Sequence, residues 1–239
     1  LVPMASPITG VPVAYPGQTG QIANRIYVGD ADGVLWRADV SGKDPTKWTM
    51  SIAWDSYSVS GDTGLIGEVV QTAPVISTNP LGDTVILFST GDQEQLTAST
   101  MQNRVWSIQE KRNAVSNSFQ TKANWYFDFV GGERVTGPMG IFDSVAHFST
   151  FAPTLPGAPA CAFGVSKIWA LDYQTAAPRF PDGNSPPKQF ETAANTIIAG
   201  VAITKTPSCD TVTTSTDPYL GTHSYISDAN GGVYQLVWQ

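Results

Sequence analysis

Charged residues are sparse in this sequence, and positive charge is scarcest. Of its 239 residues 14% are charged, 13 are Lys or Arg, and the formal net charge is −7. The cations are scattered, and no basic cluster is larger than the one around Lys111 and Arg112. A surface that follows a phosphate backbone needs concentrated Lys and Arg, so we expect no binding to nucleic acid. No run of 18 apolar residues is present, so we expect no insertion into a membrane.

Catalytic and cofactor motifs are also absent from the sequence. It contains no G-x-S-x-G, H-E-x-x-H or P-loop motif. The two histidines, His147 and His223, lie in apolar strand-like contexts at similar places of a repeat, which favours packing over catalysis. A quinone site would need an axial cluster of cations and a metal carboxylate, and neither is visible. We therefore expect no enzymatic activity and no cofactor. Paired carboxylates for glycoside hydrolysis depend on spatial separation, so that alternative stays open.

Cysteine is nearly absent. Cys161 and Cys209 have no Cys or His close in sequence, so the spacing of a metal site is missing. Neighbouring repeats in register could bring the two thiols together as a disulfide, which fits an oxidising compartment. Two unpaired buried thiols are the alternative.

The best candidate for oxygen ligands of a metal is one short segment. Asp30 and Asp32, followed by Gly33, occupy the first two ligand positions of a calcium loop. Calcium takes 6–8 oxygen ligands, and Val34 and Leu35 follow where further ligands are needed. The segment therefore favours a hairpin turn, with calcium at Asp30 and Asp32 as the alternative.

Turn residues and strand-like runs are abundant, and they repeat. The chain has 22 Gly and 17 Pro, a composition typical of turn-rich β structure. Four apolar runs each follow a turn and contain an aromatic residue, spaced 63 to 70 residues apart: Trp36, Trp106, Trp169 and Tyr234. A period of this size with strand-like units indicates a repeat architecture.

Each repeat contains further strand-like segments. A small residue and often a proline mark a first strand, expected at 8–13, 71–76, 135–139 and 198–203. A second strand is expected at 25–28, 84–88, 145–148 and 223–226, and the aromatic lies on the third. A fourth strand is expected at 48–54, 125–129 and 189–192, with none visible in the last repeat. The single weak helical candidate is 110–119.

Four strands joined by tight turns form the blade of a β-propeller. We therefore predict an all-β fold of propeller type with four visible blades, at about 6–66, 67–132, 133–194 and 195–239. The four aromatics are expected to pack between blades. A β-sandwich with accidental periodicity is the alternative. No signal peptide is visible, and the chain begins close to the first expected strand, so we expect a fragment or a processed piece.

Four sequence segments together resemble those of a known family. They are 27–39 (YVGDADGVLWRAD), 133–143 (ERVTGPMGIFD), 146–151 (AHFSTF) and 166–173 (SKIWALDY). They resemble the C-terminal propeller of the PilY family, large proteins associated with the tip of bacterial type IV pili. The similarity extends roughly over residues 8–238. The first phrase alone is less specific, because quinoprotein-like propellers carry a similar hairpin.

The resemblance implies a modified seven-bladed propeller, of which this chain holds four repeats. It implies a non-enzymatic adhesin and pilus assembly factor, exported through the periplasm to the pilus tip at the cell surface. The implied partners are minor pilins, other domains of the parent protein, and host or abiotic surface ligands. Some members carry a calcium loop that regulates pilus retraction in twitching motility. No full loop of that type is present here, so calcium at this segment stays an open possibility.

Two rival functions remain. One is a quinoprotein-like periplasmic scaffold that serves envelope assembly, and the other is a quinoprotein or carbohydrate-active propeller enzyme. Long irregular stretches at 55–68, 153–160, 176–187 and 206–218 are the candidates for contact with partners, because binding residues concentrate in loops on rigid scaffolds.

Overall fold

The computed structural model describes most of the chain. The described residues are 4–18, 20–56, 69–97, 102–113, 115–116, 118–154, 157–158, 162–179, 189–194, 197–205, 223–227 and 233–238. For residues 189–194, 204–205, 223–227 and 233–238 only the backbone is described.

The regular secondary structure of the described residues is almost entirely β-strand, which confirms the all-β prediction. They form 16 strands and one short 3₁₀ helix. The chain divides into two compact units, residues 1–135 and 136–239, which are treated separately below. No helix among the described residues is long and apolar enough to cross a membrane.

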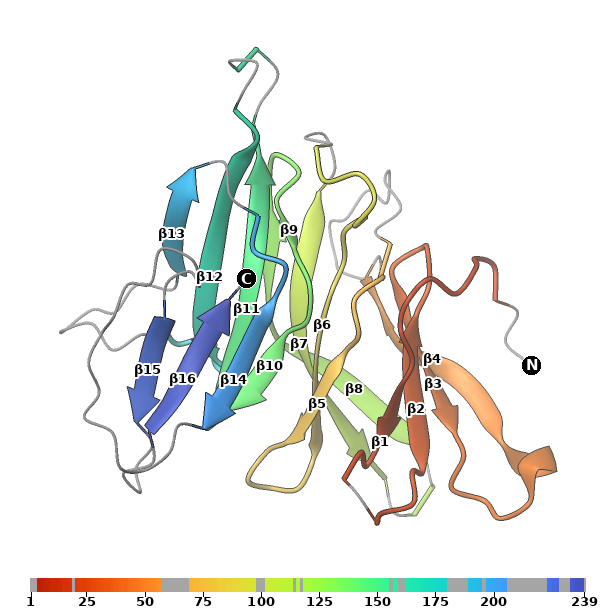
Figure 1. The fold of residues 1–239 in the computed structure, drawn as a ribbon. Helices are drawn as coiled ribbons and strands as arrows, with labels where there is room; N and C mark the ends of the chain where they lie inside the picture. Colours follow the sequence, from red (N-terminus) through yellow and green to blue (C-terminus); the bar gives the residue numbers. More distant parts are fainter. Residues whose placement is uncertain are drawn as a thin grey trace. The chain divides into compact units, whose positions relative to one another are not determined.

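The first unit contains two four-stranded antiparallel sheets (Figure 1). Sheet 1 has the order β1-β2-β3-β4, formed by β1 (Val13–Tyr15), β2 (Arg25–Gly29), β3 (Val34–Asp39) and β4 (Thr49–Asp55). Helix η1 (Pro45–Lys47) lies between β3 and β4. Sheet 2 has the order β5-β6-β7-β8, formed by β5 (Val75–Thr78), β6 (Thr84–Ser89), β7 (Asn103–Arg112) and β8 (Phe119–Phe129). The short β9 (Arg134–Val135) ends the unit.

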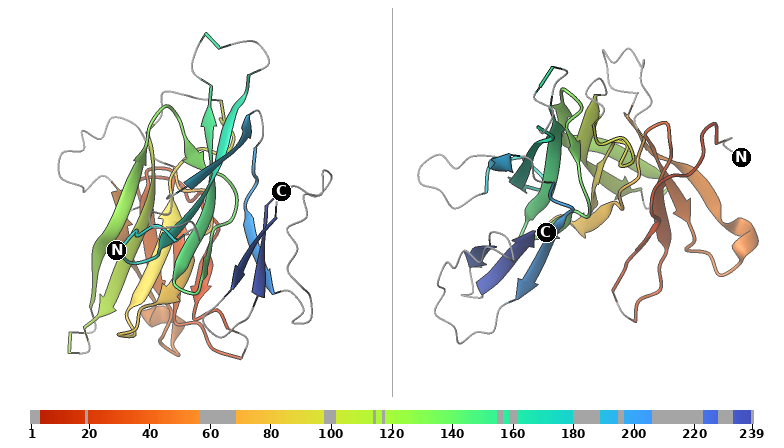
Figure 2. Two further views of the ribbon diagram at one scale, coloured as in Figure 1. Left: turned by 90° about the vertical axis from the view of Figure 1, so that its left-hand side faces the viewer. Right: turned by 45° about the horizontal axis from the view of Figure 1, so that its top comes forward.

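The second unit contains sheets 3 and 4. Sheet 3 has the order β10-β11-β12-β13, formed by β10 (Gly140–Phe142), β11 (Val145–Pro153), β12 (Gly164–Asp172) and β13 (Gln189–Ala194). Sheet 4 has the order β14-β16-β15, formed by β14 (Val201–Lys205), β15 (His223–Ser227) and β16 (Val233–Trp238). Figure 2 gives two further views of the strands.

Sheet 4 departs from the expected succession of strands joined by tight turns. Its third strand, β16, pairs with both β14 and β15, so β14 and β15 are not neighbours. The segment between β14 and β15 spans residues 206–222, long enough to pass an intervening strand, whereas the segment between β15 and β16 spans only 228–232. Connection length therefore permits this order in the last repeat.

The first strands begin later than predicted. The predicted segments at 8–13, 71–76 and 135–139 give strands that start at Val13, Val75 and Gly140. Proline precedes each of them, and proline has no N–H to donate to a ladder. In the third repeat Gly137 also has φ of +74°, and a Cβ there would meet the carbonyl oxygen of Ala199 at 1.7 Å. The residues directly before Val13 and Val75 thus lie outside these strands, and Gly137 makes a close backbone contact with Ala199.

The helical candidate at 110–119 is wrong. Strands β7 and β8 run antiparallel through it, with Glu110 opposite Thr121 and Arg112 opposite Phe119. Between them the side chain of Asn113 accepts hydrogen bonds from the backbone N–H of Val115 and Ser116, which closes a turn. Asn and Ser favour such local bonds over a helix.

The core of the first unit lies between sheets 1 and 2. Alternation along the strands places Tyr27 and Leu35 on one face of sheet 1, and Ile86 and Trp106 on one face of sheet 2. These four side chains are all fully buried in a single cluster. Burial of this apolar surface is what holds the two sheets together face to face.

Candidate functional site

A buried carboxylate lies at the edge of this core. On β7, Trp106, Ile108 and Glu110 occupy successive positions of the same pleated face, because side chains two residues apart point to the same side of a strand. The first two belong to the core cluster, and the side chain of Glu110 is 0% exposed. Isolated buried charge is strongly unfavourable, so Glu110 needs partners.

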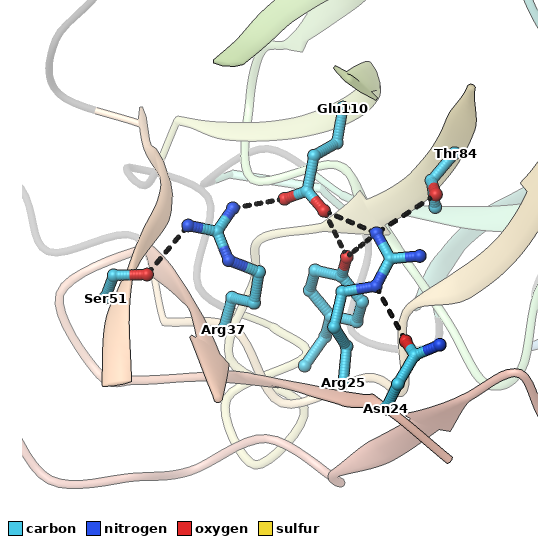
Figure 3. Close-up of polar contacts among 7 residues, drawn as sticks. Asn24, Arg25, Arg37, Ser51, Thr84 and Glu110 are labelled. Carbon is cyan, nitrogen blue, oxygen red and sulfur yellow. Dashed lines mark hydrogen bonds and ion pairs between the residues drawn. The ribbon is translucent and has the colours of Figure 1, made fainter. Parts of the chain in front are cut away.

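Sheet 1 supplies those partners (Figure 3). Nη1 of Arg25, on β2, lies 2.8 Å from Oε1 of Glu110, and the hydroxyl of Tyr27 donates to the same oxygen at 2.6 Å. Nη1 of Arg37, on β3, pairs with Oε2 at 2.5 Å. Both carboxylate oxygens therefore accept charged or hydroxyl donors that come from the facing sheet.

Neighbouring polar groups hold the two guanidinium groups in place. Arg25 also donates to the Asn24 side chain at 3.1 Å and to the Thr84 hydroxyl at 3.2 Å. Arg37 donates to the Ser51 hydroxyl at 2.8 Å. These partners come from both sheets, and they satisfy donors that a single carboxylate could not.

An aromatic ring completes the group. The guanidinium carbon of Arg37 lies 4.1 Å from the ring centroid of Phe119, and that of Arg25 lies 5.3 Å from it. Arg112, paired with Phe119 at the end of the β7–β8 hairpin, lies 5.7 Å from the same ring. Cations at this range are attracted to the ring face.

Tyr27 is a hydrogen-bond donor in this group. Burial raises the pKa of Tyr27 far above its ordinary value, and the nearby negative charge of Glu110 raises it further. The phenol therefore stays protonated and donates to Glu110. Two arginines and one phenol thus converge on one carboxylate.

This arrangement joins sheets more readily than it performs chemistry. A catalytic carboxylate must reach a substrate, yet Glu110 is fully buried with both oxygens engaged. Its partners Arg25 and Arg37 are 14% and 8% exposed in their side chains. The group therefore links sheets 1 and 2 through buried polar contacts. None of the residues predicted as site residues belongs to this group. The alternation of Trp106, Ile108 and Glu110 along one strand marks Glu110 for burial, but it does not reveal its partners.

Asp30 and Asp32 lie in the turn between β2 and β3. Oδ1 of Asp30 accepts hydrogen bonds from the backbone N–H of Asp32 and Val34, at 3.0 and 2.9 Å. Its Oδ2 accepts from the indole N–H of Trp36 at 2.8 Å. Asp30 is 1% exposed, whereas Asp32 is exposed. Hydrogen bonds to Asp30 thus connect the turn with Trp36, the aromatic residue of the repeat. Calcium binding at Asp30 and Asp32 stays a prediction.

We expect Asp30→Ala to lower the free energy of unfolding by about 2 kcal/mol, because it leaves buried donors, including the Trp36 indole, without an acceptor. Asp32→Ala is the matched control and should change it by less than about 0.5 kcal/mol. Urea unfolding of both variants measures this. Equal losses would contradict the assignment, and a calcium-dependent rise in melting temperature, abolished in both variants, would favour the calcium alternative.

The repeat aromatics occupy equivalent places where the structure describes them. Trp36, Trp106 and Trp169 are 3%, 0% and 7% exposed. The Trp169 indole donates to the Thr150 hydroxyl at 3.0 Å, and the Trp106 indole has no hydrogen-bond partner among the described residues. Tyr234 lies on β16, where only the backbone is described.

Cys161 and Cys209 lie outside the described residues, so their pairing stays a prediction.

His147 lies in the second unit, on β11 between Gly140 of β10 and Ala170 of β12. It is 2% exposed, and neither ring nitrogen has a hydrogen-bond partner among the described residues. On the same face of sheet 3, Ala170 and Ile168 pack with Ile198 and Val201. Burial in this apolar setting lowers the pKa of His147 to about 4. Only the backbone of His223 is described.

His147 should make stability depend on pH. Its folded pKa of about 4 lies below the unfolded value of 6.5, so the unfolded chain binds the proton first. Stability is then complete above pH 6.5 and is lost as the pH falls through 4, by about 3 kcal/mol for this residue. We expect His147→Leu to reduce the pH dependence of the unfolding free energy in that window. An unchanged difference between variant and parent from pH 7 to 4 would contradict this.

Among the described residues no three His, Cys, Asp or Glu side chains gather into a possible metal centre. Comparison with known proteins gives no assignment: no protein-family model matches the chain, and no curated protein matches its sequence.

Proposed function

We propose that this chain is part of a β-propeller of PilY type and acts, without catalysis, at the tip of a type IV pilus as an adhesin and assembly factor. One observation carries the proposal. In all four sheets the repeat aromatic stands opposite a residue of the second strand at the same place in the repeat: Val28 and Trp36, Phe88 and Trp106, Phe148 and Trp169, Ile226 and Tyr234.

The phrases that resemble the PilY family fall on these repeated elements. Residues 27–39 form most of the β2–β3 hairpin, and residues 166–173 cover most of β12. Sheets 1, 2 and 3 share the same strand succession, which is that of a propeller blade. Sheet 4 has a different order, so it would be an irregular blade.

The described charged group supports a scaffold rather than an enzyme. Glu110, Arg25 and Arg37 are used in joining two sheets, and a rigid joined scaffold suits the display of binding loops. The proposed partners are minor pilins, other domains of the parent protein and surface ligands. The quinoprotein-like scaffold and the propeller enzyme remain the rivals.

Immunogold labelling of the tagged parent protein tests the proposal. We expect label at pilus tips, and fewer assembled pili in a strain that lacks the gene. A variant in which the Thr and Ser residues of 206–218 are replaced by alanine keeps the length of the connection between β14 and β15, so it should still fold, but it should attach less well. Label spread through the periplasm, with normal pili in the deletion strain, would overturn the pilus function and favour the envelope scaffold.

A further inference from the structure

The tryptophans of the repeat bind their indole N–H groups within their own sheet in two of three cases. In sheet 1 the indole of Trp36 donates to Asp30 at 2.8 Å, and in sheet 3 the indole of Trp169 donates to Thr150 at 3.0 Å. Both acceptors lie two residues after the residue of the second strand that stands opposite the tryptophan. The hydrogen bond is therefore a shared feature of the repeat.

Trp106 of sheet 2 departs from this pattern. The equivalent acceptor position holds Thr90, two residues after Phe88, which stands opposite Trp106. The Thr90 hydroxyl accepts from the backbone N–H of Arg104 at 2.7 Å and lies 3.4 Å from its carbonyl oxygen. The buried indole N–H of Trp106 has no partner among the described residues. An indole nitrogen can only donate, so it needs an acceptor from elsewhere.

Two further buried donors lie beside Trp106, and both come from the end of β4. A bulge in the pairing of β3 with β4 places Trp54 opposite the core residue Leu35, so Trp54 faces sheet 2. The rings of Trp54 and Trp106 lie 5.3 Å apart between centroids. Ser56 follows two residues later and is 0% exposed. The Trp54 indole nitrogen and the Ser56 hydroxyl are both buried and have no hydrogen-bond partner among the described residues.

Arg104 connects these residues on the side of sheet 2. Its Nη1 lies 3.5 Å from the carbonyl oxygen of Ser56, and its guanidinium carbon lies 6.0 Å from the ring centroid of Trp106. Its Nε pairs with Asp128 at 2.6 Å, so its charge already has a counter-charge. An anion buried here would lack a cation of its own, which is strongly unfavourable. The three donors therefore require a small neutral acceptor.

We propose that an ordered water molecule lies between sheets 1 and 2 at this place. It accepts hydrogen bonds from the indole N–H groups of Trp54 and Trp106 and donates one to the Ser56 hydroxyl, which can accept as well as donate. A buried water typically makes about three hydrogen bonds to polar groups that are otherwise unsatisfied. This water site goes beyond the proposed function and does not rest on it.

The water gives the contact between sheets 1 and 2 two different kinds of polar bridge. Glu110 and Arg104 lie on the same face of β7, on either side of Trp106 along the strand. At Glu110 the sheets are joined by direct charged pairs with Arg25 and Arg37. Beyond Trp106 they are joined through water, which can be nearly as favourable in enthalpy as a direct hydrogen bond.

A high-resolution crystal structure of the chain tests the proposal directly. We expect density for one water at a distance of about 2.7–3.2 Å from the indole nitrogens of Trp54 and Trp106. No density at this position would overturn the proposal, and so would a carbonyl or side-chain oxygen of the chain in its place. Crystals grown in bromide distinguish water from a halide, and an anomalous peak at the site would overturn the assignment to water.

Nuclear magnetic resonance tests the same site in solution. Isotope-labelled protein should show nuclear Overhauser effects between water and the indole protons of Trp54 and Trp106. The bonded indoles of Trp36 and Trp169 are internal controls and should show none. Trp106→Phe removes one donor and should abolish the effect at Trp54, whereas Ser116→Ala, in the exposed β7–β8 turn, should leave it unchanged. An effect at Trp54 that persists in Trp106→Phe would overturn the shared water.

Discussion

Replacing Glu110 with alanine is expected to lower the free energy of unfolding by about 3–5 kcal/mol, because the change leaves two buried arginines without a counter-charge. Arg25 and Arg37 lie 2.8 and 2.5 Å from the two carboxylate oxygens and are largely buried. The Tyr27 hydroxyl loses its acceptor as well. Urea unfolding followed by tryptophan fluorescence measures the loss.

The matched control is a second Arg–carboxylate pair that is partly exposed. Arg179 pairs with Asp172, and the Arg179 side chain is 48% exposed. Asp172 keeps its hydrogen bonds from the backbone N–H of Gln174 and Thr175, so Arg179→Ala should cost no more than about 1 kcal/mol, as for other exposed pairs. A similar loss in both variants would contradict the role of burial at Glu110.

A triple variant separates the cost of unpaired charge from the cost of lost packing. Replacing Glu110, Arg25 and Arg37 together by leucine removes the whole charge group, and such replacements are often neutral or stabilising. We expect the triple variant to recover most of the stability lost in Glu110→Ala. If it unfolds as readily as the single variant, the loss comes from packing rather than from unpaired charge.

Replacing Trp106 with alanine is the other large effect, with an expected loss of about 3–5 kcal/mol for removal of a fully buried aromatic. Trp106 is 0% exposed and contacts Trp54, Phe88 and Tyr126, at ring-centroid distances of 5.3, 6.4 and 4.7 Å. The cavity left behind would lie in the middle of the contact between sheets 1 and 2. Chemical denaturation at neutral pH measures it.

Phenylalanine substitutions distinguish packing from hydrogen bonding. The Trp106 indole has no hydrogen-bond partner among the described residues, so Trp106→Phe should cost only about 1 kcal/mol. The Trp36 indole donates to Asp30, so Trp36→Phe should cost more, since it leaves a buried carboxylate oxygen without its donor. A loss below about 1 kcal/mol for Trp106→Ala would contradict the packing role.

Much of the β-structure could be predicted from local patterns. The second strands and the aromatic strands fall where apolar alternation placed them, for example at Arg25–Gly29 and Thr84–Ser89. A strand reveals itself in a few consecutive residues, and turns reveal themselves through Gly, Asn and Asp. The helical candidate at 110–119 failed because it was too short to show a period, and its Asn and Ser residues form a turn.

The buried charged group around Glu110 could not be predicted in this way. Arg25 and Glu110 are 85 residues apart in the chain, and nothing near either residue reveals the other. The sequence also gave no means to foresee that β16 would lie between β14 and β15, because strand order depends on pairing between distant segments.

Alternation, turn residues and spacing along the chain were enough to predict the all-β class, the period of the repeat and the positions of its aromatics. Which faces meet depends on the tertiary structure: sheet 1 packs on the face of sheet 2 that carries Trp106. The physical reason is that burial and charge pairing act between side chains brought together in space. Glu110 became the partner of Arg25 and Arg37 because the packing of two sheets removed all three from water.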